Sequence, residues 1–306
     1  MDTLYDVAVI GQGPAGMTAA IYAKRAGLRV LMFEYSAPGG KLVKTYEIDN
    51  WPGDPHVSGV DLALKMYTHV SELGIESEYG LVTEILDGEN KTLVLEDGRK
   101  FYAKAVIVAS GTVENKMNIP GEEPMLGKGV SFCAVCDGAF YKEKRVIVIG
   151  GGNSALEEAV YLTQFAKEVL IIIRRDVFRA DPVAIEHATH HPKIKVLKKH
   201  IPVEVISDQV VKGLKVRNVD TGEEHIEACD GIFPYIGAKP STSSLEKLNV
   251  LDEQGYLIVN EHMETSIPGL FGAGDVVVKP LRQIVTAVSD GAIAAQRVFH
   301  YLHKGS

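Results

Sequence analysis

The chain has 306 residues, which is typical of two domains, and 46% of them are hydrophobic, enough for well-buried cores. Its formal net charge is −8, and this acidic balance argues against a general nucleic-acid-binding protein, because phosphate neutralisation needs clustered cations. The first residues lack the basic start of an export signal, and no apolar stretch is long enough to span a bilayer, so we expect a cytoplasmic protein that does not bind membranes.

The beginning of the chain predicts a strand–turn–helix–strand unit. Its elements are a strand over 7–10, a glycine-rich turn, a helix over 17–26 that Gly27 ends, and a strand over 28–33 that leads into Glu34. The same plan returns further along the chain. Its elements there are a strand over 145–149, a second glycine-rich turn, a helix over about 154–165 and a strand over 169–173.

Two further segments alternate apolar and polar residues around turn sequences. They cover residues 80–102 and 203–228 and predict antiparallel β-meanders. Each is followed by an apolar strand, over 105–111 and 231–237. We therefore expect an α/β fold with two Rossmann-like dinucleotide-binding domains, each with an inserted β-meander.

The first glycine-rich turn fits G-x-G-x-x-G in its full context, after a strand and before a helix. The first glycine permits the tight turn, the second lets the backbone approach a pyrophosphate, and the third lets helix and strand pack closely. An acid ends the next strand, where a carboxylate bonds a ribose hydroxyl. A turn without a ligand is the alternative, but the context favours a dinucleotide site made by Gly11, Gly13, Pro14, Ala15, Gly16 and Glu34.

The second turn fits G-x-G-x-x-A. Its candidate nucleotide-binding residues are Gly150, Gly152, Asn153, Ser154 and Ala155. The strand after it ends in Arg174 and Arg175, with Arg179 close by, and not in an acid. Because a guanidinium group binds phosphate oxygens in pairs, these arginines favour the 2′-phosphate of NADPH. The alternative is a solvated basic surface patch.

The chain has three cysteines, too few for a secreted disulfide scaffold, and two of them form the pair Cys133-x-x-Cys136. Such a pair can close a small working disulfide, whereas a structural zinc site would need two more ligands. We therefore expect a redox pair and no metal site. Asp137 follows directly and is a candidate proton donor or acceptor, or a turn former before Gly138. Cys229 is expected to be a small core residue.

Taken together, these motifs resemble bacterial low-molecular-weight thioredoxin reductases over essentially the whole chain. The segment C-A-x-C-D-G lies immediately before the second nucleotide-binding strand, as in that family. Further matching segments are Asp49-Asn50-Trp51-Pro52-Gly53, Phe271-Gly272-Ala273-Gly274-Asp275, Arg282-Gln283 and Gly291-Ala292.

The resemblance implies FAD on the first loop, NADPH on the second, thioredoxin as the substrate and a homodimer. It also implies that Cys136 lies nearer the flavin, that Cys133 exchanges with the thioredoxin disulfide, and that Asp137 donates the proton. The further residues expected to contact FAD are Gly40, Lys41, Asn50, Gly111, Gly274, Asp275, Arg282, Gln283 and Ile284.

The expected FAD-binding domain is residues 1–112 together with 246–306, and the NADPH-binding domain, with the cysteine pair, is residues 113–245. Nicotinamide and disulfide then share one domain although both must reach the flavin in the other. We therefore expect the domains to rotate about hinges near Gly111-Thr112 and Gly237-Ala238.

Three positions depart from the family pattern: Ile173 replaces a histidine, Lys41 a glutamine, and Ala139-Phe140 a double aromatic. The alternative enzyme is a flavin-dependent dithiol oxidase, which has no need of NADPH. The alternative from another class is a non-catalytic flavin redox sensor, which predicts bound flavin without turnover. The paired arginines and the intact second loop favour the reductase.

Overall fold

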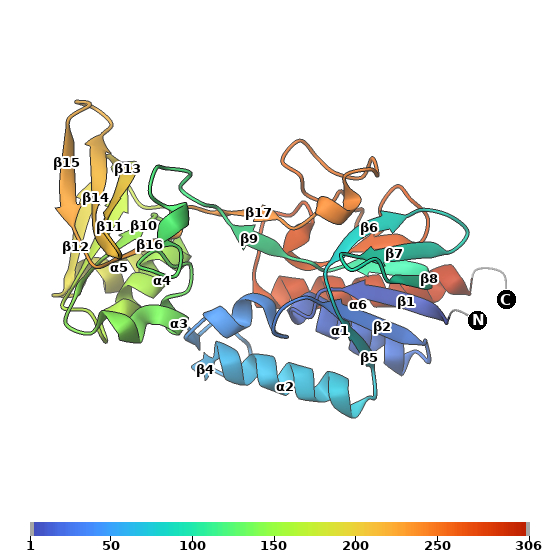
Figure 1. The fold of residues 1–306 in the computed structure, drawn as a ribbon. Helices are drawn as coiled ribbons and strands as arrows, with labels where there is room; N and C mark the ends of the chain where they lie inside the picture. Colours follow the sequence, from blue (N-terminus) through green and yellow to red (C-terminus); the bar gives the residue numbers. More distant parts are fainter. Residues whose placement is uncertain (1–2, 304–306) are drawn as a thin grey trace. The chain divides into compact units, whose positions relative to one another are not determined.

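The computed structural model describes residues 3–303 (Figure 1). The chain forms two compact units. The first takes in the chain up to Val113 and again from Lys239, and the second comprises Glu114–Ala238. The expected α/β fold with two Rossmann-like parts is confirmed.

The first unit is built on a mixed sheet in the order β5-β2-β1-β8-β7-β6 (Figure 1). A further strand, β18, pairs with the second half of β8. The strands are β1 (Leu4–Ile10), β2 (Val30–Glu34), β5 (Glu76–Tyr79), β6 (Val82–Leu86), β7 (Lys91–Leu95), β8 (Lys100–Val108) and β18 (Leu270–Gly272). The strands β5, β2, β1, β8 and β18 pair in parallel, so their carboxyl ends lie along one edge. Ligands of open α/β sheets bind at such an edge.

The first meander differs from its expected form. We predicted a separate meander over 80–102 and a strand over 105–111, but β8 serves both. Its first half pairs antiparallel with β7 and is partly exposed. Its second half, from Ala105 to Val108, is buried between β1 and β18. One strand can do both because its sequence changes from alternating to continuously apolar at Ala105.

Three helices belong to this unit: α1 (Pro14–Arg25), α2 (Gly59–Glu72) and α6 (Ile284–Leu302). Helix α1 begins three residues earlier than predicted, because Pro14 suits the first helical turn and follows an extended Gly13. Gly27 follows the helix with a positive φ of 84°, as a terminating glycine does. No helix within residues 3–303 has the length and apolar character needed to cross a membrane.

Side chains from both faces of the first sheet are buried. On one face, α1 and α6 cover Val7, Val9 and Ile107. On the other face, Phe33 and Val106 pack with segments near the end of the chain, including Leu245 and Leu257. The sheet is thus the middle layer of three, which explains why β1 and β2 are almost wholly apolar.

The second unit repeats this plan on a smaller scale. Its all-parallel sheet has the order β12-β11-β10-β16, made by β10 (Arg145–Ile149), β11 (Glu168–Ile173), β12 (Ile194–Lys198) and β16 (Gly231–Pro234). Helices α4 (Asn153–Leu162) and α5 (Pro182–His190) cover one face. The expected second meander covers the other, as an antiparallel sheet of β13 (His200–Ser207), β14 (Val211–Asn218) and β15 (Glu224–Ala228).

Two short strands, β9 (Thr112–Glu114) and β17 (Ala238–Pro240), connect the units and pair with each other. The second unit ends at Ala238, and not at residue 245 as we expected. The intervening residues include Leu245, which is completely buried in the core of the first unit. This burial draws the chain back into the first unit earlier than its pattern indicated.

Helix α6 approaches α1 so closely that residue 291 must be glycine. A Cβ on Gly291 would lie 2.2 Å from the carbonyl oxygen of Ala15. We expect Gly291→Ala to lower the free energy of unfolding by roughly 1–3 kcal/mol, because backbone overpacking outweighs the helix-propensity gain of about 1 kcal/mol. Urea unfolding should show the loss, and Ser289→Ala on the exposed part of the same helix should not. A Gly291→Ala protein as stable as the parent would contradict this packing.

Candidate active site

The first glycine-rich loop has the three constraints that its sequence indicated. A Cβ on Gly11, which has a φ of 102°, would lie 2.4 Å from the carbonyl oxygen of Ala109, and one on Gly16 would lie 1.9 Å from that of Gly11. Around Gly13 a Cβ would meet nothing within 4 Å. The loop therefore packs tightly on its inner side and leaves open space at the glycine expected to face a pyrophosphate.

Glu34 lies beside this loop at the end of β2. Its carboxylate accepts hydrogen bonds of 2.9 Å from the backbone N–H groups of Gln12, Tyr35 and Ser36. Two carboxylate oxygens offer about four acceptor sites. The three amides therefore fix the carboxylate next to the loop and leave it an acceptor site for a ribose hydroxyl.

Several expected flavin-contact residues meet at the carboxyl edge of the first sheet. A Cβ on Gly40 would come within 3.3 Å of the Gly13 Cα, so this segment lies directly over the loop. The Lys41 ammonium donates to the Thr112 hydroxyl at 2.5 Å and lies 3.6 Å from the carboxylate of Asp275. Gly111 and Gly274 also lie at this edge, and both have positive φ.

A second group of expected flavin-contact residues comes from segments that are far apart in the sequence of the first unit. Asn50 Nδ2 donates to Gln283 Oε1 at 3.2 Å, across 233 positions of the chain. Gln283 caps α6 through a capping box with Thr286, so Ile284 becomes the first residue of that helix. Arg282, by contrast, donates to the carbonyl oxygens of residues 275, 277 and 279. Its guanidinium group therefore holds the loop that carries Asp275.

Sequence reasoning missed Asp290. This residue is buried in the apolar helix α6, where its carboxylate accepts the backbone N–H of Gly274 at 2.9 Å and pairs with Lys279. A buried acid at a helix position facing the core was the available signal, since such a group needs partners. Asp290 thereby fixes the glycine next to Asp275, which is expected to contact FAD.

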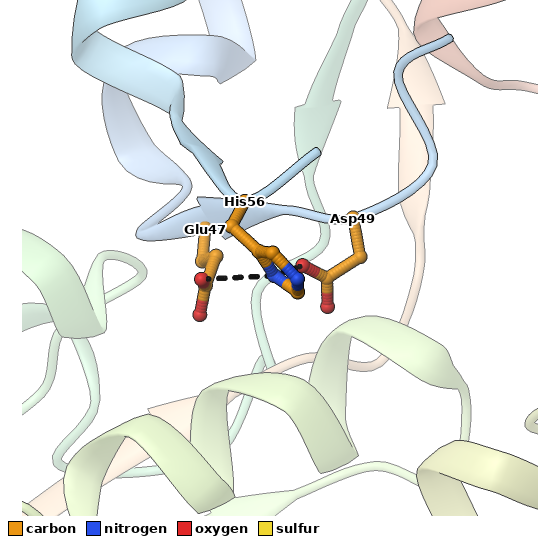
Figure 2. Close-up of side chains that lie close together, drawn as sticks. All are labelled: Glu47, Asp49 and His56. Atoms are coloured by element: carbon orange, nitrogen blue, oxygen red, sulfur yellow. Dashed lines mark hydrogen bonds and ion pairs between the residues drawn. The ribbon is translucent and has the colours of Figure 1, made fainter. Parts of the chain in front are cut away.

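Glu47, Asp49 and His56 form the group in residues 3–303 whose ligand atoms are close enough to share a metal ion (Figure 2). The imidazole Nδ1 of His56 is 2.8 Å from Asp49 Oδ1 and 3.4 Å from Glu47 Oε1. All three are exposed at the hairpin of β3 (Glu47–Ile48) and β4 (Val57–Ser58). Their mutual contacts close the hairpin next to Asn50.

The second glycine-rich loop has the same inner contact as the first. A Cβ on Gly150, which has a φ of 141°, would lie 2.2 Å from the carbonyl oxygen of Tyr235, and one on Gly152 would meet nothing within 4 Å. Asn153 exchanges two hydrogen bonds with Asp181. Ser154 is exposed and Ala155 is buried in α4. The expected nucleotide-binding residues are thus gathered at one strand–helix junction.

The three arginines follow β11 at this junction. Arg174, Arg175 and Arg179 are exposed, and the backbone N–H of Arg179 donates to the Gly151 carbonyl at 2.7 Å, which ties the segment to the loop. None of their guanidinium groups has a hydrogen bond or ion pair with another residue of the described part of the chain. Their donors are therefore free for an anionic ligand.

Cys133 and Cys136 form a disulfide at the start of the short helix α3 (Ala134–Asp137), in the same unit as the second loop. The Cys136 N–H donates to the Cys133 Sγ at 3.1 Å, and the Asp137 N–H to the Cys133 carbonyl at 3.2 Å. Cys133 is buried and Cys136 is exposed. An N–H group aimed at sulfur favours the thiolate once the bond is reduced.

Two residues were not found from the sequence: Tyr235, which contacts helix α3, and Glu158, on the helix α4 that packs against it. The Tyr235 hydroxyl accepts a hydrogen bond of 3.1 Å from the backbone N–H of Ala134. The Glu158 side chain lies on α4 with one buried carboxyl oxygen that has no hydrogen-bond partner in the described chain. No sequence motif marks either residue, since an isolated tyrosine and a helical glutamate are common.

The comparisons with known proteins agree with this geometry. The family model described as pyridine nucleotide-disulphide oxidoreductase matches residues 5–291. The chain is 44% identical to the thioredoxin reductase of Bacillus subtilis (strain 168) over 305 residues, covering 99% of this chain and 96% of that protein. The crystal structure of Lactococcus lactis thioredoxin reductase in its FR conformation is 44% identical, with a TM-score of 0.96, over 98% of this chain and 99% of that one. That of T. acidophilum thioredoxin reductase is 32% identical, with a TM-score of 0.92, over 97% and 98%.

Cys229 should be chemically silent in the folded protein. Burial raises the pKa of its thiol to about 12, so almost no reactive thiolate exists in mildly alkaline buffer. With Cys133 and Cys136 oxidised, we expect no thiol to react with a disulfide reagent until the protein unfolds, when one should appear. A fast-reacting thiol in the native oxidised protein would contradict the core assignment.

Proposed function

The chain belongs to the pyridine nucleotide-disulphide oxidoreductase family, and we propose that it is a thioredoxin-disulfide reductase that uses NADPH and FAD. The observation that carries the proposal is the Cys133–Cys136 disulfide, which lies in the unit whose nucleotide loop adjoins three unpaired arginines. A dithiol oxidase would have no use for such a phosphate-binding segment.

The residues of the first unit fit FAD. Gly13 leaves room for a pyrophosphate, which the first N–H groups of α1 can bind, and Glu34 retains an acceptor site for the ribose. We assign the flavin side to the cluster of Lys41, Asp275, Asn50 and Gln283. The chemistry that bound FAD supplies is acceptance of a hydride from NADPH and delivery of the electron pair to a disulfide.

The residues of the second unit fit NADPH. Gly152 leaves the same open space above the start of α4 as Gly13 does above α1. Arg174, Arg175 and Arg179 present unpaired guanidinium groups where the ribose 2′-phosphate is expected, and Ile173 before them adds no polar contact. Three neighbouring cations with no acidic partner in the described part of the chain favour the phosphorylated cofactor over NADH.

The cysteine pair transfers the electrons to the substrate. Reduction breaks the Cys133–Cys136 bond and takes up two electrons and two protons. We assign Cys133 to the attack on the thioredoxin disulfide, Cys136 to the resolution of the mixed disulfide, and Asp137 to proton transfer at the leaving thiolate. The products are reduced thioredoxin and the re-formed Cys133–Cys136 disulfide, so atoms and electrons balance.

We further propose that the two units move relative to each other during turnover. The disulfide and the NADPH-binding loop lie in one unit and the FAD-binding loop in the other. The connecting strands β9 and β17 are short, and Gly111 and Gly237 beside them have positive φ. Small residues at element ends are suitable hinges. We also propose a homodimer located in the cytoplasm, as the family resemblance implies.

Replacing either active-site cysteine should separate the two halves of the reaction. We expect Cys133→Ser and Cys136→Ser to abolish thioredoxin reduction but to leave flavin reduction by NADPH intact, because hydride transfer uses neither thiol. Stopped-flow flavin absorbance and a thioredoxin assay measure the two steps. Cys229→Ala is the matched control and should keep both. Substantial thioredoxin turnover in either serine variant would refute the dithiol relay.

Removing an arginine should weaken cofactor discrimination. We expect Arg174→Ala or Arg175→Ala to lose roughly 1.5–3 kcal/mol of NADPH binding, or about one to two decades in affinity, with little effect on NADH. Equilibrium titration with both cofactors measures this, and Lys212→Ala, at an exposed cation elsewhere in the unit, is the control. Equal losses for NADPH and NADH would show that these residues do not bind the 2′-phosphate.

A further inference from the structure

Tyr235 contacts both the glycine-rich nucleotide loop of the second unit and residues 133–138, which carry the cysteine pair and are called the redox turn below. Its backbone N–H donates to the Ile149 carbonyl at 2.7 Å, and its own carbonyl oxygen is the atom that excludes a side chain at Gly150. Its hydroxyl accepts the N–H of Ala134, the completely buried residue after Cys133. One residue thus fixes the loop with its backbone and the turn with its side chain.

Glu158, on helix α4, lies within electrostatic range of Tyr235. The redox turn packs on this part of the chain, since a Cβ on Gly138 would lie 3.2 Å from Phe165 and 3.4 Å from Leu162. The Glu158 residue is half-buried, and its Oε2 is a buried acceptor without a donor in the described chain. An unpaired buried oxygen costs free energy, and such groups are uncommon in native proteins.

Within residues 3–303, Tyr235 has an unused hydrogen-bond donor and Glu158 has an unused acceptor. The Tyr235 hydroxyl accepts one bond and retains a proton for which residues 3–303 provide no acceptor. Burial raises the pKa of the Tyr235 phenol, and the negative charge of Glu158 raises it further, so the phenol stays protonated and lies within electrostatic range of that carboxyl. The carboxylates of Glu114 and Asp137 also face Tyr235.

The charge of Glu158 depends on pH near neutrality. Burial, with the negative charge of Glu157 beside it, raises the pKa of the Glu158 carboxyl to about 8. The carboxyl is therefore largely neutral at neutral pH and becomes an anion above pH 8. No cation contributes to this shift. An anion at Glu158, within electrostatic range of the Tyr235 hydroxyl that holds the Ala134 N–H, would oppose formation of a thiolate at the cysteine pair.

We propose that Tyr235 and Glu158 are positioning residues for the redox turn: the phenol holds the Ala134 amide, and the carboxyl determines how readily the reduced cysteine pair carries negative charge. This inference rests on the proposed redox role of Cys133 and Cys136. It requires neither NADPH nor thioredoxin, so it can be tested with a small dithiol alone.

The test compares the flavin-loaded parent and Glu158→Gln in anaerobic buffers of reduced and oxidised dithiothreitol. Exchange breaks the Cys133–Cys136 bond as dithiothreitol closes its cyclic disulfide, and acid quenching followed by alkylation and mass spectrometry counts the reduced pair. About one pH unit below the Glu158 pKa the two proteins should be equally reduced. About one unit above it, Glu158→Gln should favour the reduced pair by about threefold to tenfold, because the parent then carries the opposing charge.

Tyr235→Phe tests whether the phenol positions the Ala134 amide of the redox turn. It removes the acceptor of the Ala134 N–H, so we expect slower thiol exchange at every pH, whereas Tyr141→Phe, which removes another hydroxyl from the same core, should exchange at the parent rate.

Three results would overturn the proposal. The first is that the reduced fraction of the cysteine pair differs between Glu158→Gln and the parent by the same factor at every pH. The second is an unchanged rate of thiol exchange in Tyr235→Phe. The third is a loss of NADPH affinity in Glu158→Gln with an unaltered thiol equilibrium, which would assign the open oxygen to the nucleotide. A failure of the proposed function would look different, because Cys133 and Cys136 would then not exchange with dithiothreitol in the parent protein.

Discussion

Both nucleotide sites depend on one contact, the approach of a loop glycine to the backbone of the neighbouring strand. In the first unit Gly11 touches the Ala109 carbonyl just after β8, and in the second Gly150 touches the Tyr235 carbonyl just after β16. Any side chain at either glycine would push the loop away from the sheet edge. The helix that follows would then no longer direct its first N–H groups at the place where a pyrophosphate binds. Loop, strand end and helix are thus fixed together in each unit.

The two units differ in what surrounds this shared contact, and the difference divides their tasks. In the first unit the second strand ends in Glu34, held by three amides next to the loop, which suits an unphosphorylated ribose. In the second unit the equivalent strand leads to three exposed arginines that have no acidic partner among residues 3–303. The second unit also carries the disulfide, so the proposed NADPH site and the cysteine pair belong to one unit, and the proposed FAD site belongs to the other.

The sequence predicted most of the fold and the disulfide between Cys133 and Cys136, because glycine loops, strand-ending charges and a C-x-x-C pair are local signals. Strands such as β10 were predicted to the residue, and Cys133 and Cys136 do form a disulfide. Contacts between distant segments could not be read in this way. The sharing of β8 by two pairings, the return of the chain to the first unit before Leu245, and the support of Gly274 by Asp290 all arise from tertiary packing. Tyr235 and Glu158 were missed for the same reason.

The central claim is that electrons from NADPH reach the Cys133–Cys136 disulfide through bound flavin. An anaerobic titration of the flavin-loaded protein with NADPH, followed by flavin absorbance and by mass spectrometry of alkylated cysteines, tests it most directly. We expect Cys133 and Cys136 to become alkylatable as NADPH is consumed, while Cys229 stays unmodified in the folded protein. Complete bleaching of the flavin with the disulfide still intact, at any excess of NADPH, would contradict it.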